Sequence, residues 1–212
     1  MDISGINSKN NFSFILASKS PRRRHLLNKL NIPFRVDAAS INEDYKDNEK
    51  PQQLVQRLAQ QKAKAVAVRH SESYILGADT VVAMNDEIIG KPNSSRQATH
   101  ILQKLSDKTH EVFTGVALLK TDEKNRIIQK EHFFERTSVT FGRLSPALIQ
   151  AYLKMGKPMD KAGAYGIQDR WGAIFVQKIE GDFYNVVGLP LHSLFHCLIA
   201  FAPEFFNLNS LK

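Results

Sequence analysis

The chain has 212 residues, 42% of them hydrophobic and 24% charged, which is ordinary for a globular protein and indicates one domain, or one domain with two lobes. A formal net charge of +8 favours an anionic partner such as a nucleotide, nucleic acid or a membrane headgroup. The single cysteine, Cys197, excludes an internal disulfide framework, and no apolar run reaches membrane-spanning length, so we expect a soluble, cytoplasmic protein.

The chain begins with a polar stretch, a short strand and a helix. Residues 1–12 are polar and predict a disordered tail ahead of a single domain over 13–212. An apolar run over 14–17 predicts a buried strand. Ser20 and Pro21 then make a favourable N-cap and first residue for a helix.

Three arginines occupy the first turn of this predicted helix. The helix macrodipole disfavours each cation there by ~0.3–1 kcal/mol, so Arg22, Arg23 and Arg24 favour a bound polyanion. Arg23 shares an inward-facing stripe with Leu26 and Leu27, whereas Arg24 lies off that stripe and is expected to be solvated.

The later elements alternate between helices and strands, which predicts an α/β fold with a mixed sheet. They are a helix over 51–69, a strand–turn–strand over 74–90 with its turn at Asn85 and Asp86, a helix over 94–105, strands over 111–119 and 127–141, a helix over 145–155, an irregular glycine-rich segment over 156–166, a hairpin that joins 172–179 to 183–187 through a turn at 180–182, and a final helix over 188–201.

Polar residues within apolar segments are the first candidates for chemistry. Asp79 interrupts an apolar strand, so it needs a cation, a hydrogen-bond network or a raised pKa. It could cap a turn, or it could bind a hard divalent cation. Glu43, in an acidic loop, could supply a second carboxylate or be a solvated loop residue. Lys62 lies in the apolar stripe of its helix, where snorkelling into water is the common outcome, and Lys64 lies off the stripe.

Other candidates carry weaker signals. Lys91 follows a glycine at the end of a strand. Tyr165 and Gln168 lie in a glycine-rich stretch that could contact a nucleobase or be a structural loop. His192 and His196 have the i, i+4 spacing of half a zinc site, but no second pair completes it, and a structural role is favoured. The sequence contains no Walker A and no G-x-G-x-x-G pattern, so side chains and the helix terminus must bind phosphate.

Seven segments, taken together, resemble one family. They are S-x-S-P-R-R near the N-terminus, RLAQQKA, LGADTVV, GKP, FTGVAL, DKAGAYGIQ and NVVGLPL. In this order and spacing, from about residue 14 to about residue 198, the chain resembles the Maf family of nucleoside triphosphate pyrophosphatases. Each segment is weak alone, but the set is specific.

This resemblance implies a fold like the inosine triphosphate pyrophosphatase group: a mixed twisted sheet with flanking helices and two lobes around a cleft. It implies hydrolysis of a nucleoside triphosphate to the monophosphate and pyrophosphate with a divalent metal, Mg²⁺ or Mn²⁺. The family's general base or metal-handling aspartate falls on Asp79 and its acidic loop residue on Glu43, the two expected metal ligands. Its phosphate-binding residues fall on Ser18, Arg23, Lys62 and Lys91.

Three positions separate the family by base preference, and here they are Arg22, Thr80 and Gln168. This combination resembles the branch that acts on dTTP and UTP, whereas the branch that prefers 7-methyl-GTP carries tryptophan, glutamine and glutamate. Two departures touch the rim of the expected base pocket: Lys157, where an acidic residue is common, and the run 169–171 (Asp-Arg-Trp), where small residues are usual.

The expected partner is therefore a nucleoside triphosphate, with no stable nucleic acid and no membrane, and a homodimer is plausible for the family. A competing hypothesis is a nucleic-acid- or protein-binding regulator of septum formation, because a basic chain with an arginine cluster could serve that role too. Basic residues that alternate with carboxylates in apolar settings favour a small polyanionic substrate instead.

Overall fold

The computed structural model describes residues 12–46, 48–155 and 158–206. The predicted tail, except Phe12, and Lys157 lie outside these ranges. The strands are β1 (Ser13–Leu16), β2 (Arg35–Val36), β3 (Ser73–Met84), β4 (Glu87–Ile89), β5 (Thr109–Thr121), β6 (Ile127–Phe141) and β7 (Val176–Glu180). The α-helices are α1 (Pro21–Asn28), α2 (Pro51–Ala67), α3 (Ser95–Leu105), α4 (Pro146–Met155), α5 (Phe183–Val187) and α6 (Leu191–Phe201); the 3₁₀ turns are η1 (Pro158–Asp160), η2 (Ala162–Ala164), η3 (Gly172–Phe175) and η4 (Pro203–Phe205).

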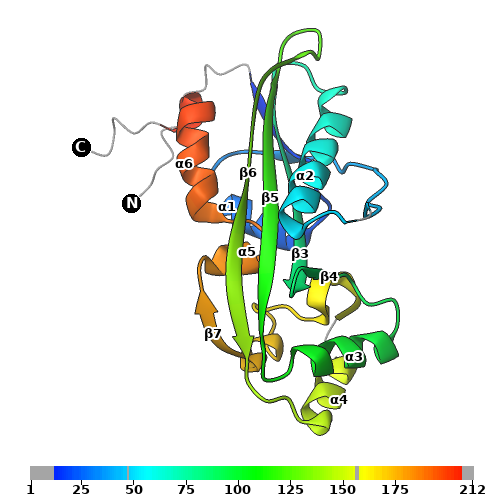
Figure 1. Cartoon of the computed structure of the whole chain (residues 1–212). Coiled ribbons are helices and arrows are strands. Elements are labelled where there is room, and N and C mark those ends of the chain that lie inside the picture. Colours follow the sequence, from blue (N-terminus) through cyan, green and yellow to red (C-terminus); the bar gives the residue numbers. More distant parts are fainter. Residues whose placement is uncertain (1–11, 47, 156–157, 207–212) are drawn as a thin grey trace, which may run out of the picture.

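Within the described ranges, the strands form one mixed sheet in the order β2-β1-β3-β5-β6-β7, with β4 also paired to β3. The β1 strand is parallel to β2 and β3, and the remaining pairs are antiparallel. Helix α2 covers one face, and α1, α5 and α6 lie on the other (Figure 1). The predicted α/β class with a mixed sheet and flanking helices is thus confirmed. No helix in the described part of the chain has the length and apolar character that a membrane span requires.

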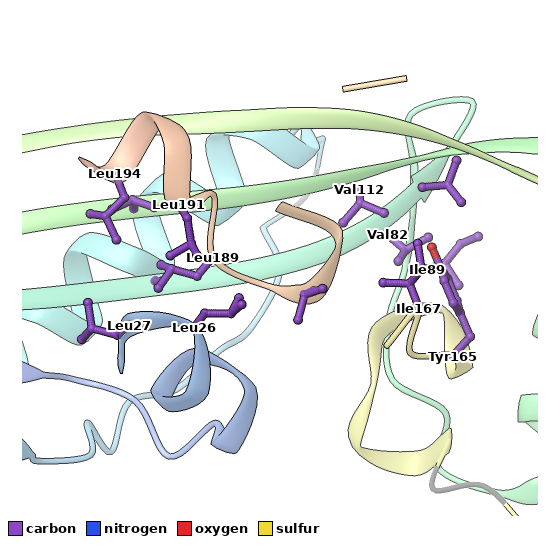
Figure 2. Close-up of a cluster of buried hydrophobic side chains, with 14 of the residues drawn as sticks. Leu26, Leu27, Val82, Ile89, Val112, Tyr165, Ile167, Leu189, Leu191 and Leu194 are labelled. Carbon is purple, nitrogen blue, oxygen red and sulfur yellow. The ribbon is translucent and has the colours of Figure 1, made fainter. Parts of the chain in front are cut away.

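The strands β5 and β6 run through both ends of an elongated molecule. Helices α1, α2 and α6 gather at one end of these strands, and α3, α4 and β4 at the other (Figure 1). Figure 2 shows the corresponding division of the buried side chains: leucines of α1 and α6 form one group, and Val82, Ile89, Val112, Tyr165 and Ile167 form another further along the sheet. The predicted two-lobed arrangement is present.

Helix α2 lies unusually close to the sheet because two glycines lie beneath it. A Cβ added at Gly77 would lie 2.3 Å from the Ala59 carbonyl oxygen, and one added at Gly115 would lie 2.3 Å from the Val55 carbonyl. Any larger residue would force the helix backbone outward. Gly115 is also the β5 partner of Asp79, so this close contact occurs next to that carboxylate.

One edge of β3 has a gap between two partners. The β5 strand pairs with β3 from Tyr74 to Ala83, and β1 pairs with the opposite edge only up to Leu76. On that second edge, β4 resumes the pairing at Val82. Residues 77–81 therefore have no strand neighbour on this edge among the described residues.

One expectation about the fold was wrong. Residues 183–187 form helix α5 rather than the second strand of a hairpin, and β7 pairs with β6 instead. Gly181 turns the chain with a φ of +126°, and the Asp182 side chain caps the helix by accepting from the Tyr184 amide at 2.6 Å. The buried Asn185 amide then donates to the Val112 carbonyl at 3.1 Å.

Candidate active site

A pocket opens at the gap in the β3 edge, between the two lobes. Seven charged residues line it, together with an apolar wall and the hydroxyls of Ser20 and Thr80. The charged residues are Arg22, Arg23, Lys62, Asp79, Lys91, Asp160 and Lys161, and the wall includes Val82, Val112, Tyr165, Val186 and Val187. A pocket with an excess of cations and one apolar wall suits a ligand that has an anionic part and a flat, less polar part.

Asp79 and Lys62 form a buried ion pair at the floor of the pocket. The Lys62 ammonium lies 2.5 Å from Asp79 Oδ1 and 2.8 Å from Glu43 Oε1. Asp79 and Lys62 are 7% and 8% exposed, so the structure contradicts snorkelling for Lys62 and supports a cation as the partner of Asp79. Partial burial would raise the pKa of Glu43, but the hydrogen bond and charge of Lys62 hold that pKa below its usual value.

Arg23 reaches the same pocket from the opposite face of the sheet. Its Nε donates to the Gly188 carbonyl at 2.9 Å, and its Nη atoms donate to Thr80 Oγ1 at 2.9 Å and to Ser18 Oγ at 3.4 Å. Burial lowers the pKa of the Arg23 guanidinium, and the Asp79 carboxylate opposes that shift. A guanidinium that is largely stripped of water and held in a fixed orientation is well prepared to bind an anion.

Thr80 is part of the support for Arg23. Successive residues of a strand face opposite sides of the sheet, so Asp79 faces α2 whereas Thr80 faces α1. The Thr80 hydroxyl also lies 2.9 Å from Thr114 Oγ1, and the Thr114 hydroxyl is fully buried. The predicted specificity residue Thr80 therefore holds the predicted phosphate-binding residue Arg23 in place.

Arg22 bridges the mouth of the pocket from one lobe to the other. Its Nη1 donates to Asp160 Oδ2 at 3.0 Å and its Nη2 to the Asp160 carbonyl at 3.4 Å. Arg24, by contrast, is exposed, as its position off the helix stripe predicts. The Ser20 hydroxyl caps α1 by accepting from the Arg23 amide at 3.4 Å.

Lys91 and Gln168 lie at the rim and are exposed. Gln168 Nε2 donates to Asp169 Oδ1 at 3.2 Å, so the Asp169 of the unusual 169–171 run contacts a predicted specificity residue directly. Tyr165 lines the pocket, but it is only 5% exposed, and its hydroxyl lies 2.8 Å from His110 Nε2. Tyr165 is therefore mainly a core residue.

Sequence reasoning missed Asp160 and Lys161. The Lys161 side chain is buried among pocket residues, and its ammonium lies 2.8 Å from Asp160 Oδ1 and 3.2 Å from Asp169 Oδ2. A Cβ added at Gly166 would lie 2.8 Å from both Lys161 Cε and Asp169 Oδ2, so this glycine makes room for the ion pair. The available signal was an adjacent acid and base directly ahead of the Ala-Gly-Ala turn.

The two carboxylates that contact Lys62 fit a divalent cation only in combination with a phosphate ligand. Asp79 and Glu43 contact one ammonium, so their oxygens lie close together and offer the hard donors that Mg²⁺ prefers. The described residues contain no group of three or more His, Cys, Asp or Glu side chains that could hold a metal ion. Mg²⁺ commonly uses one or two carboxylates and completes its shell with substrate phosphates and water, and this donor set matches that pattern.

The histidines of the terminal helix lie away from this pocket. The rings of His192 and His196 meet edge to face with centroids 4.6 Å apart. Burial together with the charge of Glu131 raises the pKa of the Cys197 thiol to about 11. A protonated thiol is a poor metal ligand and a poor nucleophile. The structural interpretation of this cluster is therefore the better one.

The fold and the pocket together form a cleft in which cationic side chains converge on a shielded carboxylate. A sequence model of the family described as Maf-like protein matches residues 13–201. The chain belongs to the Maf family.

Curated relatives agree with this assignment. The chain is 50% identical over 181 residues to a dTTP/UTP pyrophosphatase of Bacillus cytotoxicus, which covers 85% of this chain and 91% of the relative. It is 49% identical over 177 residues to a dTTP/UTP pyrophosphatase of Halalkalibacterium halodurans, with 84% and 90% covered. Among solved structures, a HAM1 protein from Coxiella burnetii aligns with a TM-score of 0.39 and 15% identity over 63% of this chain and 74% of that one. The likeness to the inosine triphosphate pyrophosphatase group stays a prediction.

Proposed function

We propose that this chain hydrolyses dTTP and UTP to the nucleoside monophosphate and pyrophosphate, as a cytoplasmic enzyme that removes these nucleotides, or modified pyrimidine nucleotides, from the pool. The observation that carries the proposal is the convergence of Arg23, Lys62 and Lys91 on the shielded Asp79 in one pocket. Relatives about 50% identical over most of their length bear the name dTTP/UTP pyrophosphatase, which supports the choice of substrate.

In this proposal the cations bind the triphosphate. Arg23 holds a phosphate oxygen from one side of the β3 edge, together with Ser18 and the first turn of α1, and Lys62 and Lys91 lie across the same pocket. Fixed positive groups at this place stabilise the negative charge that develops on pyrophosphate as it leaves. The bound triphosphate also offsets the unfavourable cluster of arginines at the start of the helix.

Asp79 is the proposed general base. Its carboxylate is shielded, lies at the open edge and is held by Lys62. A water molecule between Asp79 and the α-phosphorus could give up its proton to that carboxylate as it attacks. Asp79 and Glu43 would hold Mg²⁺ or Mn²⁺, which neutralises phosphate charge when bound.

The base is proposed to lie against the apolar wall of the pocket. Arg22 and Gln168 line the mouth beside this wall and supply hydrogen-bonding groups for a pyrimidine. Thr80 contributes through Arg23, which it orients. We further propose that the enzyme needs no stable nucleic-acid or membrane partner and that it forms a homodimer.

A nucleotide panel tests this function. Pyrophosphate and monophosphate release are measured for dTTP, UTP, dCTP, dGTP and 7-methyl-GTP with Mg²⁺, with Mn²⁺ and with EDTA. The proposal expects turnover of dTTP and UTP that needs the metal. A preference for 7-methyl-GTP would overturn the choice of base, and no cleavage of any triphosphate would favour a binding regulator.

A pair of lysine variants ties this activity to the pocket. Lys62→Met removes the ammonium that pairs with Asp79 and is expected to abolish turnover. Lys64→Met changes an exposed lysine of the same helix and is expected to leave turnover unchanged. Equal activity of the two variants would contradict the assigned site.

A further inference from the structure

The acidic loop, residues 41–46 and 48–50, is tied to helix α2 by an arginine. Arg57 Nε donates to Glu49 Oε1 at 2.6 Å, and Arg57 Nη2 donates to Glu49 Oε2 at 2.6 Å. The same Nη2 also donates to the Asp44 carbonyl at 3.0 Å. One guanidinium therefore binds the loop through a side chain near its end and through the backbone next to Glu43.

This ion pair is better shielded than most surface pairs. Only 19% of the Arg57 side chain and 9% of the Glu49 side chain are exposed, whereas both partners of the Lys178–Glu180 pair on β7 are exposed. Two parallel hydrogen bonds between a guanidinium and a carboxylate fix the orientation of the partners as well as their separation. Arg57 Nη1 also donates to Gln61 Oε1 at 3.3 Å, so the guanidinium is held on α2 as well.

The loop depends on such contacts for its position. In the described residues between β2 and α2 no helix or strand forms, so contacts with neighbouring elements set where the loop lies. Two of these contacts come from α2: Arg57 binds the Asp44 carbonyl, and the Lys62 ammonium lies 2.8 Å from Glu43 Oε1. A helix rises 1.5 Å per residue, so these anchors are about 7.5 Å apart along one rigid element.

Glu43 is the side chain that this arrangement brings to the cleft. Together with Asp79 and Lys91, it lines a cavity of about 250 Å³, and Asp79 and Lys91 also line the pocket described above. Glu43 itself is exposed, so packing does not hold it there. Its position depends on the contact with Lys62 and on the adjoining backbone that Arg57 binds.

We propose that Arg57 is a positioning residue. By binding Glu49 and the Asp44 carbonyl, it keeps Glu43 beside Asp79, where the two carboxylates hold a divalent cation together with the triphosphate. Arg57 is not among the described residues that line either cavity, so it acts through Glu43. This inference rests on the proposed function and deepens it. Groups that orient metal ligands from outside the site change metal affinity by about 10–100-fold when they are removed.

The test measures how much the metal contributes to nucleotide binding. Calorimetry gives the Kd of α,β-imido-UTP, which cannot be cleaved between its α- and β-phosphorus, once with Mn²⁺ and once with EDTA. The ratio of the two Kd values reports the metal contribution. Arg57→Gln should lower this ratio by about tenfold or more. Arg57→Lys keeps the charge but cannot make the bidentate contact, so its ratio should lie between those of Arg57→Gln and the wild-type enzyme.

A double-mutant cycle separates positioning from general destabilisation. Glu43→Gln should lower the ratio by itself, and adding Arg57→Gln to it should cause no further loss, because the effect of Arg57 passes through Glu43. If Arg57→Gln does not fold, Glu49→Gln replaces it in the cycle, because it weakens the same contact from the other side. A second full loss in the double variant overturns the inference.

Arg126→Gln is the matched control. Arg126 Nε donates to Asp122 Oδ2 at 2.7 Å in the turn between β5 and β6, and Arg126 is not among the described residues that line either cavity, so its substitution should leave the ratio unchanged. An unchanged ratio in Arg57→Gln overturns the inference, and dTTP or UTP cleavage by the wild-type enzyme leaves the proposed substrates standing. Equal wild-type Kd values with Mn²⁺ and with EDTA also overturn it. A wild-type enzyme that cleaves neither dTTP nor UTP removes both proposals.

Discussion

The close contact of α2 with the sheet gives the sharpest prediction, for the substitution Gly115→Ala. The added Cβ would lie 2.3 Å from the carbonyl carbon and oxygen of Val55 and 2.7 Å from the Gln56 amide nitrogen. These are backbone atoms of a helix, so no side chain can rotate away. Restoring an ordinary separation of 3.4 Å moves this part of α2 by about 1.1 Å. Because Gly115 pairs with Asp79 and Lys62 lies further along the same helix, the displacement occurs beside the ion pair that these two residues form.

Two losses follow from this displacement. A misplacement of about 1 Å at a catalytic group costs on the order of 100-fold in rate, so kcat/KM for dTTP should fall by about that factor. Overpacking of a tight contact costs about 1–3 kcal/mol of stability, which lowers the Tm by about 2–4 °C per kcal/mol in a chain of this size. Pyrophosphate release and thermal unfolding, measured on the same samples, separate the two effects.

Gly142→Ala is the matched control. A Cβ at Gly142 would lie 4.0 Å from its nearest neighbour, the Phe175 carbonyl oxygen, which is an ordinary contact. This variant should keep both the wild-type Tm and the wild-type rate. If Gly115→Ala behaved like Gly142→Ala in both measurements, the argument that these glycines set the position of Lys62 would fail.

Three more predictions concern single side chains. Asp79→Asn should retain the fold and abolish turnover, and near-normal release of pyrophosphate would remove Asp79 from the mechanism. Arg23→Ala should lower kcat/KM for the triphosphate, because it removes the guanidinium held by Ser18 and Thr80; an unchanged value would refute its role. Burial lowers the pKa of His110 to about 4, from 6.5 in an unfolded chain. Between these two pH values the unfolded state therefore binds a proton on His110 that the folded state does not bind. As the pH falls from 6.5 to 4, about 3 kcal/mol of folding stability is lost. His110→Gln should flatten that part of the curve of Tm against pH, and parallel curves for the two proteins would contradict the assignment.

The sequence predicted most of the regular elements because their periodicities are strong. The apolar run of β3 and the apolar stripe of α2 identified both elements, together with Asp79 and Lys62 as the ionisable residues that interrupt them. Residues 183–187 were misassigned because a short, mostly apolar run fits a strand as well as a helix. The deciding interactions, such as the bond from Asn185 to Val112, are tertiary and leave no local pattern.

The candidate site was only partly accessible to sequence reasoning. Each of Asp79, Lys62 and Arg23 was unusual for its own segment, but their convergence depends on where β1 ends and β4 begins along β3. Asp160 and Lys161 were missed because they lie in an irregular segment, where no period marks a polar residue as inward-facing. Family resemblance supplied the roles of Glu43, Lys91 and Gln168, and those roles stay predictions.

The continuous pairing of β5 with β6 has a mechanical consequence. Antiparallel partners join these strands from Thr109 to Thr121, through both lobes, so the lobes share a stiff ribbon instead of a flexible hinge. Such a ribbon resists large swings and permits only gentle bending and twisting. The relative placement of the two lobes on either side of the cleft is therefore set when this ribbon folds.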